Sequence, residues 1–187
     1  KFTKEGRFLL GWGKFGSAEG QFDRPWGITI DHNGDVYVVD WSNNRVQKFS
    51  AEGEFLMSFG SQLGDGSSLN HPADVAVDND GDVYVTDWGN RRVQIYSPDG
   101  DMLATLHGDA IKSSKAGEYA LSRNQEDFDR AYDRIDDLTR VGRFRRPTAI
   151  AVGQDNKIVI SDNPGRLQVY VKDNNYLEPA LNVEIDF

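Results

Sequence analysis

The feature that most constrains this chain is an internal repeat. Residues 1–13, 25–31 and 33–40 are matched at a constant displacement of 47 positions by residues 48–60, 72–78 and 80–87. A third copy starts at residue 147, displaced by 75 positions from residue 72, so it carries 28 extra residues ahead of it. Repetition at this length is typical of stacked units that bury their apolar faces against one another. We therefore expect one unit spanning residues 1–187.

Within each copy, apolar residues alternate with polar ones or form short β-branched runs, as in strands. In the second copy the predicted strands are residues 73–77, 82–86, 92–96 and 102–106. Asp-Gly and Pro-Asp-Gly turns separate them, and these favour hairpins because glycine takes positive φ. Four antiparallel strands per copy predict an all-β fold, a β-propeller. The expected blades are residues 25–60, 72–107 and 147–187, with residues 1–13 as an outer strand of a neighbouring or closing blade.

The copies resemble NHL repeats, whose pattern includes Pro-x-Gly-Ile-x-Val-Asp, Gly-x-Val-Tyr-Val-x-Asp and Asn-x-Arg-Val-x-x-Phe. The first copy has these almost literally at residues 25–31, 34–40 and 43–49, with Ile30 at the Val position, and the second follows closely. The third departs, with Gly153 in place of an Asp and a loop between Asp162 and Arg166 that is one residue shorter. The resemblance implies a closed ring, commonly of six blades.

Three blades do not close a ring, so two interpretations remain open. The missing blades belong to a longer propeller, or two chains pair as a homodimer of three plus three blades. In the second case residues 7–12 of one chain complete the last blade of the other, or the tail at residues 176–187 supplies that closing strand.

A polar set recurs in the loop after the second strand of each copy. Short polar side chains cap turns, and arginine holds carboxylate and backbone oxygens in a fork geometry, so we interpret the set as turn and inter-blade bracing. Its members are Asp40, Asn43, Arg45, Asp87, Asn90, Arg92, Asp162 and Arg166.

Cationic residues precede the first proline of each copy and are expected at the mouth of the propeller channel. Convergent cations suit a carboxylate or a phosphate. The alternative is that they pair with nearby aspartates and lie over apolar surface. The candidate ligand-binding residues are Arg24, His71, Arg145, Arg146, Trp26 and Asp74.

Aromatic residues mark candidate partner contacts. Trp41 and Trp88 follow the loop Asp in two copies, where they serve either a partner or packing between blades. The insertion at residues 109–143 carries an amphipathic helical pattern in which Phe128 and Tyr132 share one face. That helix is expected either to dock a partner on the channel face or to pack on its own blade.

The balance of 30 acidic against 21 basic residues gives a formal charge of −9, which disfavours nucleic acid and anionic membranes overall. The chain has no cysteine, and no apolar run predicts a membrane helix or a signal peptide, so its location in the cell stays open.

These patterns favour a binding or scaffold propeller for a protein, peptide or small anionic ligand. One alternative is part of a metal-dependent propeller enzyme, of the lyase or lactonase kind found among relatives of the family. A second alternative is an RNA-binding NHL domain. We assign no catalytic residue, metal ligand or cofactor, because only three histidines are present and they fall in different parts of the copies.

Overall fold

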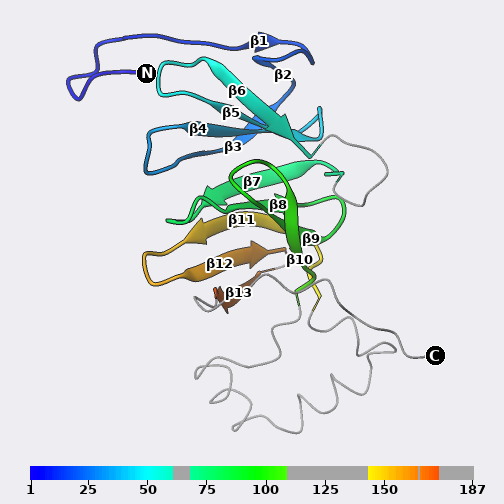
Figure 1. Ribbon diagram of the computed structural model, residues 1–187. Coiled ribbons are helices and arrows are strands. Elements are labelled where there is room, and N and C mark those ends of the chain that lie inside the picture. Colours follow the sequence, from blue (N-terminus) through cyan, green and yellow to red (C-terminus); the bar gives the residue numbers. More distant parts are fainter. Residues whose placement is uncertain (61–67, 109–142, 164, 173–187) are drawn as a thin grey trace, which may run out of the picture.

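The computed structural model describes residues 1–60, 68–108, 143–163 and 165–172, and it is a stack of antiparallel sheets (Figure 1). The first blade contains β3 (Pro25–Ile30), β4 (Val36–Asp40), β5 (Arg45–Phe49) and β6 (Phe55–Phe59). The second contains β7 (Pro72–Val77), β8 (Val83–Asp87), β9 (Arg92–Tyr96) and β10 (Met102–Leu106). The third contains β11 (Pro147–Val152), β12 (Lys157–Asp162) and β13 (Arg166–Val171).

Strands within each blade pair in chain order, which confirms the prediction of antiparallel propeller blades. The fourth strand of the third blade would fall outside the described residues, as do the predicted helix of the insertion and its Phe128 and Tyr132. None of the described segments forms a helix of the length and apolarity needed to cross a membrane.

In the first two blades, aspartate side chains shape the turn between the innermost strand and the next, that is between β3 and β4 and between β7 and β8. The Oδ1 atom of Asp31 accepts hydrogen bonds from the backbone N–H groups of Asn33 and Asp35, both at 2.9 Å. Gly34 in this turn has φ of 88°, a left-handed conformation that glycine adopts without steric cost. The second blade repeats the arrangement around Asp78, so a repeated sequence motif produces a repeated turn.

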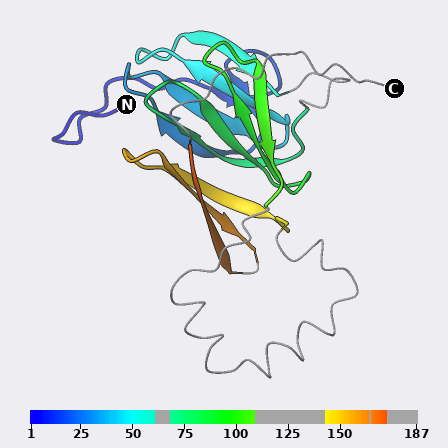
Figure 2. The same ribbon diagram turned by 60° about the horizontal axis from the view of Figure 1, so that its bottom comes forward.

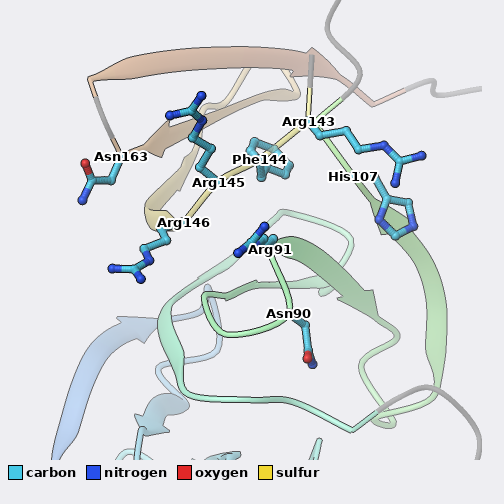
Figure 3. Close-up of a pocket in the computed structure, with 8 residues that line it drawn as sticks. All are labelled: Asn90, Arg91, His107, Arg143, Phe144, Arg145, Arg146 and Asn163. Atoms are coloured by element: carbon cyan, nitrogen blue, oxygen red, sulfur yellow. The ribbon is translucent and has the colours of Figure 1, made fainter. Parts of the chain in front are cut away.

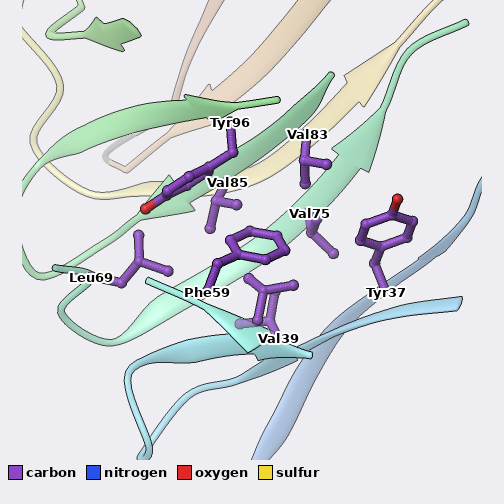
Figure 4. Packing of buried hydrophobic residues seen from close by; sticks show 9 residues of the cluster. Tyr37, Val39, Phe59, Leu69, Val75, Val83, Val85 and Tyr96 are labelled. Carbon is purple, nitrogen blue, oxygen red and sulfur yellow. The ribbon is translucent and has the colours of Figure 1, made fainter. Parts of the chain in front are cut away.

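Apolar side chains fill the spaces between adjacent blades (Figure 4). Phe59 of the first blade packs on Tyr96 of the second, with ring centroids 4.8 Å apart. Val39, Val46 and Val85 in this junction have no exposed surface. A second cluster, with Tyr84 and Ile160, joins the second and third blades. Burial of these faces holds the stack together.

The segment before the first blade packs on the face of that blade that points away from the second blade. β1 (Lys14–Phe15) and β2 (Gln21–Phe22) form a short parallel ladder, and residues 1–13 contain one antiparallel bridge, between Phe2 and Phe8. Trp12 lies 6.0 Å from the ring of Phe49, centroid to centroid. This segment is therefore packed on the blade although it forms no long strand.

The long insertion enters and leaves the stack at one point. The backbone N–H of Phe144 donates to the carbonyl oxygen of His107 at 2.9 Å. The equivalent bond between the first two blades, from Leu69 N–H to the carbonyl of Gly60, is 2.7 Å long. Because the same hydrogen bond is kept, the 28 extra residues change the loop and leave the blade packing intact.

Candidate functional site

The candidate site lies at one edge of the stack, which we call the rim. The rim contains the starts of β3, β7 and β11 and the loops that follow β4, β8 and β12. These parts are joined by backbone hydrogen bonds, for example from Ser42 N–H to Asp23 O at 3.1 Å and from Asn163 N–H to Arg146 O at 3.1 Å. A break in register follows the first proline of each inner strand, and such bulges re-aim the neighbouring side chains.

A buried aspartate organises the rim of the first blade. Asp40 is fully buried and accepts from Asp23 N–H at 2.7 Å, Asn43 Nδ2 at 2.8 Å and Arg45 Nε at 3.0 Å. The Arg45 guanidinium also donates to the carbonyl of Gln21 at 2.9 Å. Because this carboxylate already accepts three hydrogen bonds from within the fold, it has the geometry of a structural brace.

The other two blades repeat this contact. Asp87 accepts from Asn90 Nδ2 at 2.9 Å and Arg92 Nε at 2.7 Å. In the third blade Asp162 binds Arg166, at 2.7 Å, and the backbone N–H groups of Arg145 and Arg146. Those two backbone bonds fix the start of β11.

Aromatic and cationic side chains meet at the rim of the first junction. The ring of Trp41 lies 4.1 Å from His71 and 5.3 Å from Trp26, measured between centroids. The Arg24 guanidinium lies 5.6 Å from the Trp41 ring centroid. The indole Nε1 of Trp41 is buried without a partner among the described residues. The structure thus brings together three of the ligand-binding candidates, Arg24, His71 and Trp26, around one partner-contact candidate.

At the second junction the rim opens into a cavity of about 670 Å³ (Figure 3). Asn90 and Arg91 line it from the second blade and His107 from the strand end before the insertion. The third blade contributes Arg143, Phe144, Arg145, Arg146 and Asn163. Arg146 also stacks on Trp88, with its Cζ atom 4.5 Å from the ring centroid. Figure 3 shows that the lining residues come from both blades.

The four arginines of this cavity have no acidic partner in the described part of the chain. They are exposed, whereas Phe144 between them is buried. Arg91 has φ of 58°, a left-handed conformation that costs a non-glycine residue about 1 kcal/mol. Strained backbone of this kind is found preferentially at functional sites. Together these features make the cavity an anion-binding candidate.

Asp74, another ligand-binding candidate, is engaged between blades instead. Its Oδ2 atom accepts from the backbone N–H of Ile150 at 3.0 Å, and Oδ1 accepts from Val75 N–H at 2.9 Å. Burial raises the pKa of this carboxyl, although both hydrogen bonds oppose the shift. The carboxyl lies away from the cavity lining.

The opposite edge of the stack carries an ion cluster. Lys172 Nζ lies 2.7 Å from Asp78, 2.8 Å from Asp80 and 2.8 Å from Asp82. Burial works to lower the pKa of Lys172, but its hydrogen bonds to the three carboxylates outweigh burial and raise it. The single ammonium thus pairs with all three carboxylates, and the cluster keeps a net negative charge. In the described ranges, no three His, Asp or Glu side chains are placed to hold a metal ion.

Comparison with protein families gives a match to the NHL repeat at residues 22–49 and 69–96. The two matched segments coincide with the first three strands of the first and second blades. The chain therefore contains two NHL repeats.

Curated relatives match this NHL-repeat chain over one short stretch. Protein lin-41 of Caenorhabditis elegans is 56% identical over 39 residues, which is 21% of this chain and 3% of the relative. The E3 ubiquitin-protein ligase TRIM71 of Rattus norvegicus is 46% identical over 39 residues, 21% of this chain and 5% of the relative. The chain therefore spans only a small part of the length of these relatives.

Two solved propeller structures are similar to the NHL-repeat chain. A streptogramin B lyase has a TM-score of 0.42 at 18% identity, covering 79% of this chain and 40% of its own. Virginiamycin B lyase from Staphylococcus aureus has a TM-score of 0.47 at 16% identity, covering 91% of this chain and 47% of its own.

The repeat pattern explains which cavity residues sequence analysis identified. Arg145 and Arg146 precede the proline of an inner strand, a position that the NHL repeat marks. Arg91, Arg143 and His107 were missed. Arg91 aligns with Asn44 of the first blade, and this difference between two repeat positions is the sequence feature that could have identified Arg91 as a cavity residue.

Proposed function

We propose that this NHL-repeat chain is a binding module that holds an acidic segment of a protein or peptide partner at the rim. The observation that carries the proposal is the cavity with four arginines that lack acidic partners in the described residues. An arginine guanidinium binds a carboxylate through two parallel hydrogen bonds, and such charge-assisted bonds are strong.

The shape of the site favours a compact ligand. A cavity of about 670 Å³ lies within the size range of ordinary ligand pockets, and buried Phe144 gives it an apolar floor. Trp26, with 58% of its surface exposed, extends the rim with an aromatic contact for a neighbouring side chain. A segment with acidic and aromatic residues matches both features.

Charge argues for a short acidic segment over an extended polyanion. The formal charge of the chain is −9, so the cationic rim is a local feature of an acidic molecule. A nucleic acid needs a basic track that neutralises many phosphates. The Asp-rich edge around Lys172 would repel a strand that wrapped past the rim.

Binding of a fluorescein-labelled hexapeptide of alternating Glu and Tyr, followed by fluorescence anisotropy at 150 mM salt, tests this function. The double variant Arg145→Gln/Arg146→Gln should bind at least about 10-fold more weakly, since each lost charge-assisted hydrogen bond contributes more than 1 kcal/mol. Arg7→Gln, an exposed arginine outside the rim, is the matched control and should leave binding unchanged.

A labelled single-stranded RNA decamer is titrated in parallel. If the RNA binds more tightly than the peptide and its affinity falls steeply between 50 and 200 mM salt, the partner is a nucleic acid and the proposal is wrong. Equal peptide binding by the double variant and the wild-type chain would also overturn it.

A further inference from the structure

The cavity at the second junction is lined mostly by hydrogen-bond donors, and this restricts the chemistry of its ligand. The third blade lies against the second blade on the side away from the first, so two blades form the cavity walls (Figure 2). The described residues that line it are four arginines, two asparagines, one histidine and one phenylalanine, without a carboxylate or a hydroxyl among them. A guanidinium has five N–H donors and no acceptor. The lining therefore favours a ligand that is rich in acceptors and in negative charge.

The backbone that carries these arginines is held by contacts that do not use the guanidinium N–H groups. The backbone N–H groups of Arg145 and Arg146 donate to Asp162 at 3.0 and 2.7 Å. The Arg146 side chain is oriented by its stack on Trp88. The backbone N–H of Arg91 donates to the carbonyl oxygen of Trp88 at 3.4 Å. Groups that are held in place in advance lose less freedom on binding, so the donors of the cavity are preorganised for a ligand.

Packing between blades does not account for the four arginines. At the first junction the equivalent rim positions carry no arginine and are Asn44, Ser68, Asn70 and His71. There the backbone N–H of His71 donates to Asn44 at 2.8 Å and closes the rim. Two blades therefore meet without these charges, and the arginines of the second junction are an addition to the repeat that a ligand explains.

A single carboxylate satisfies this lining poorly. All four arginines are exposed, and an exposed pair of one carboxylate with one cation contributes little because water and salt screen it. The two oxygens of a carboxylate match one guanidinium in a bidentate contact, which leaves the other arginines unpaired. A phosphomonoester has three terminal oxygens and a charge of about −1.5 to −2 at pH 7, so it accepts from several guanidinium groups at once.

The charge of the whole chain also favours a ligand whose negative charge is concentrated. Four of the 21 basic residues line the cavity, so the surface outside it is more acidic than the formal charge of −9 indicates. A segment that gains its charge from several Glu or Asp residues spreads them beyond the cavity, where this acidic surface repels them. A phosphorylated side chain instead places its charge on one group inside the cavity.

We propose that the group held in the cavity is a phosphorylated side chain of the partner segment, so that binding depends on phosphorylation of the partner. This inference rests on the proposed function of the rim and specifies its ligand. The phosphate accepts from Arg91 of the second blade and from Arg145 and Arg146 of the third. Inorganic phosphate offers the same chemistry, but it leaves most of a cavity of about 670 Å³ unfilled.

Three labelled hexapeptides test the proposal by fluorescence anisotropy at pH 7.5 and 150 mM salt. They are the alternating Glu and Tyr peptide and two versions of it in which one central Glu is replaced by serine or by phosphoserine. The phosphoserine peptide should bind at least about 10-fold more tightly than the Glu peptide, and the serine peptide should bind most weakly. Arg145→Gln/Arg146→Gln should remove most of the preference for phosphoserine, whereas the control Arg7→Gln should keep it. Circular dichroism confirms that each variant keeps its strands.

The outcomes separate this inference from the proposed function. Equal affinity for the phosphoserine and Glu peptides would overturn the inference and leave the proposed function standing, whereas no binding of any of the three peptides would overturn both. A preference for phosphoserine that survives in the double variant would place the phosphate outside the cavity and would also overturn the inference. Inorganic phosphate should displace the phosphoserine peptide only at concentrations at least about 10-fold above the Kd of that peptide. Displacement at or below that Kd would mean that free phosphate, and not a phosphorylated segment, is the ligand.

Discussion

The junction between the first and second blades and the junction between the second and third use equivalent positions for different contacts. At the first, the Oδ1 atom of Asn44 accepts from His71 N–H at 2.8 Å, and the His71 ring lies on Trp41. At the second, Arg91 stands where Asn44 would be, and Arg146 N–H donates to Asp162 of its own blade at 2.7 Å. The rim is closed by a hydrogen bond at the first junction and opens into the cavity at the second.

The contacts that stabilise the second junction lie away from the rim. Asp74 receives a hydrogen bond from the third blade near the middle of the stack, and Lys172 reaches back to three carboxylates at the opposite edge. In the first blade, the equivalent aspartate turn is paired within its own blade, with Lys48 Nζ 3.0 Å from Asp35. Because these contacts between the second and third blades lie away from the rim, the cationic side chains of the rim remain available for a ligand.

The largest expected difference between the junctions lies in their cores. Phe59→Ala should lower the free energy of unfolding by about 3–5 kcal/mol, since it removes a buried aromatic ring that packs on Tyr96. Leu106→Ala changes the outer strand of the second blade at a half-buried position and should cost about 1–2 kcal/mol. Urea unfolding followed by circular dichroism measures both.

These two substitutions test whether the first junction holds the denser core. Leu103→Ala, at an exposed position on β10, serves as the control and should change stability by no more than about 0.5 kcal/mol. Equal losses for Phe59→Ala and Leu106→Ala would mean that the two cores contribute alike.

Asn44 and Arg91 occupy equivalent rim positions, and replacing each by the other tests the comparison of the two junctions directly. Asn44→Arg removes the acceptor of His71 N–H and places arginine at φ of 54°. We expect a loss of about 2 kcal/mol, from the unpaired N–H and the left-handed backbone. Differential scanning calorimetry measures it as a lowered Tm.

The reciprocal variant, Arg91→Asn, should raise the free energy of unfolding by about 0.5–1 kcal/mol, because asparagine tolerates φ of 58° better than arginine does. The same variant should weaken peptide binding at the cavity. A stabilised variant with unchanged binding would show that Arg91 takes no part in the site.

The repeat made the strands and the brace predictable, because the same residues recur at constant spacing and local turn chemistry fixes each hairpin. The rim position of Arg145 and Arg146 followed from the same spacing. Phe128 and Tyr132 of the insertion fall outside the described residues, so their contact role stays a prediction.

The cavity as a whole could not be predicted in this way. Arg91 belongs to a turn in one blade and His107 to a strand end, and only packing of the blades brings them beside Arg143. Lys172 escaped notice for the same reason. Its three aspartate partners lie 90 to 94 positions away along the chain, on a different blade.

The smallest expected effect concerns the ion cluster of the second junction. Lys172→Met keeps an apolar stem but removes the cation from three carboxylates. At pH 7 and low salt we expect a loss of about 0.5 kcal/mol in the free energy of unfolding, and a smaller loss at 0.5 M salt. Lys157→Met breaks a pair in which both side chains are more than half exposed, and it should have a smaller effect.

The loss caused by Lys172→Met should depend on pH in a defined direction. The hydrogen bond from Lys172 holds the pKa of Asp80 below its usual range, so this stabilisation is present above about pH 4 and is lost as the pH falls through the lowered value. At the alkaline end the raised pKa of Lys172 keeps the ammonium charged beyond its ordinary value of 10.5, so the contribution persists there. Urea unfolding of both chains between pH 2 and pH 9 should give curves that converge below about pH 4. A constant separation over that range would mean that Lys172 acts by packing, and that the second junction has no electrostatic contact to set against the hydrogen-bonded rim of the first.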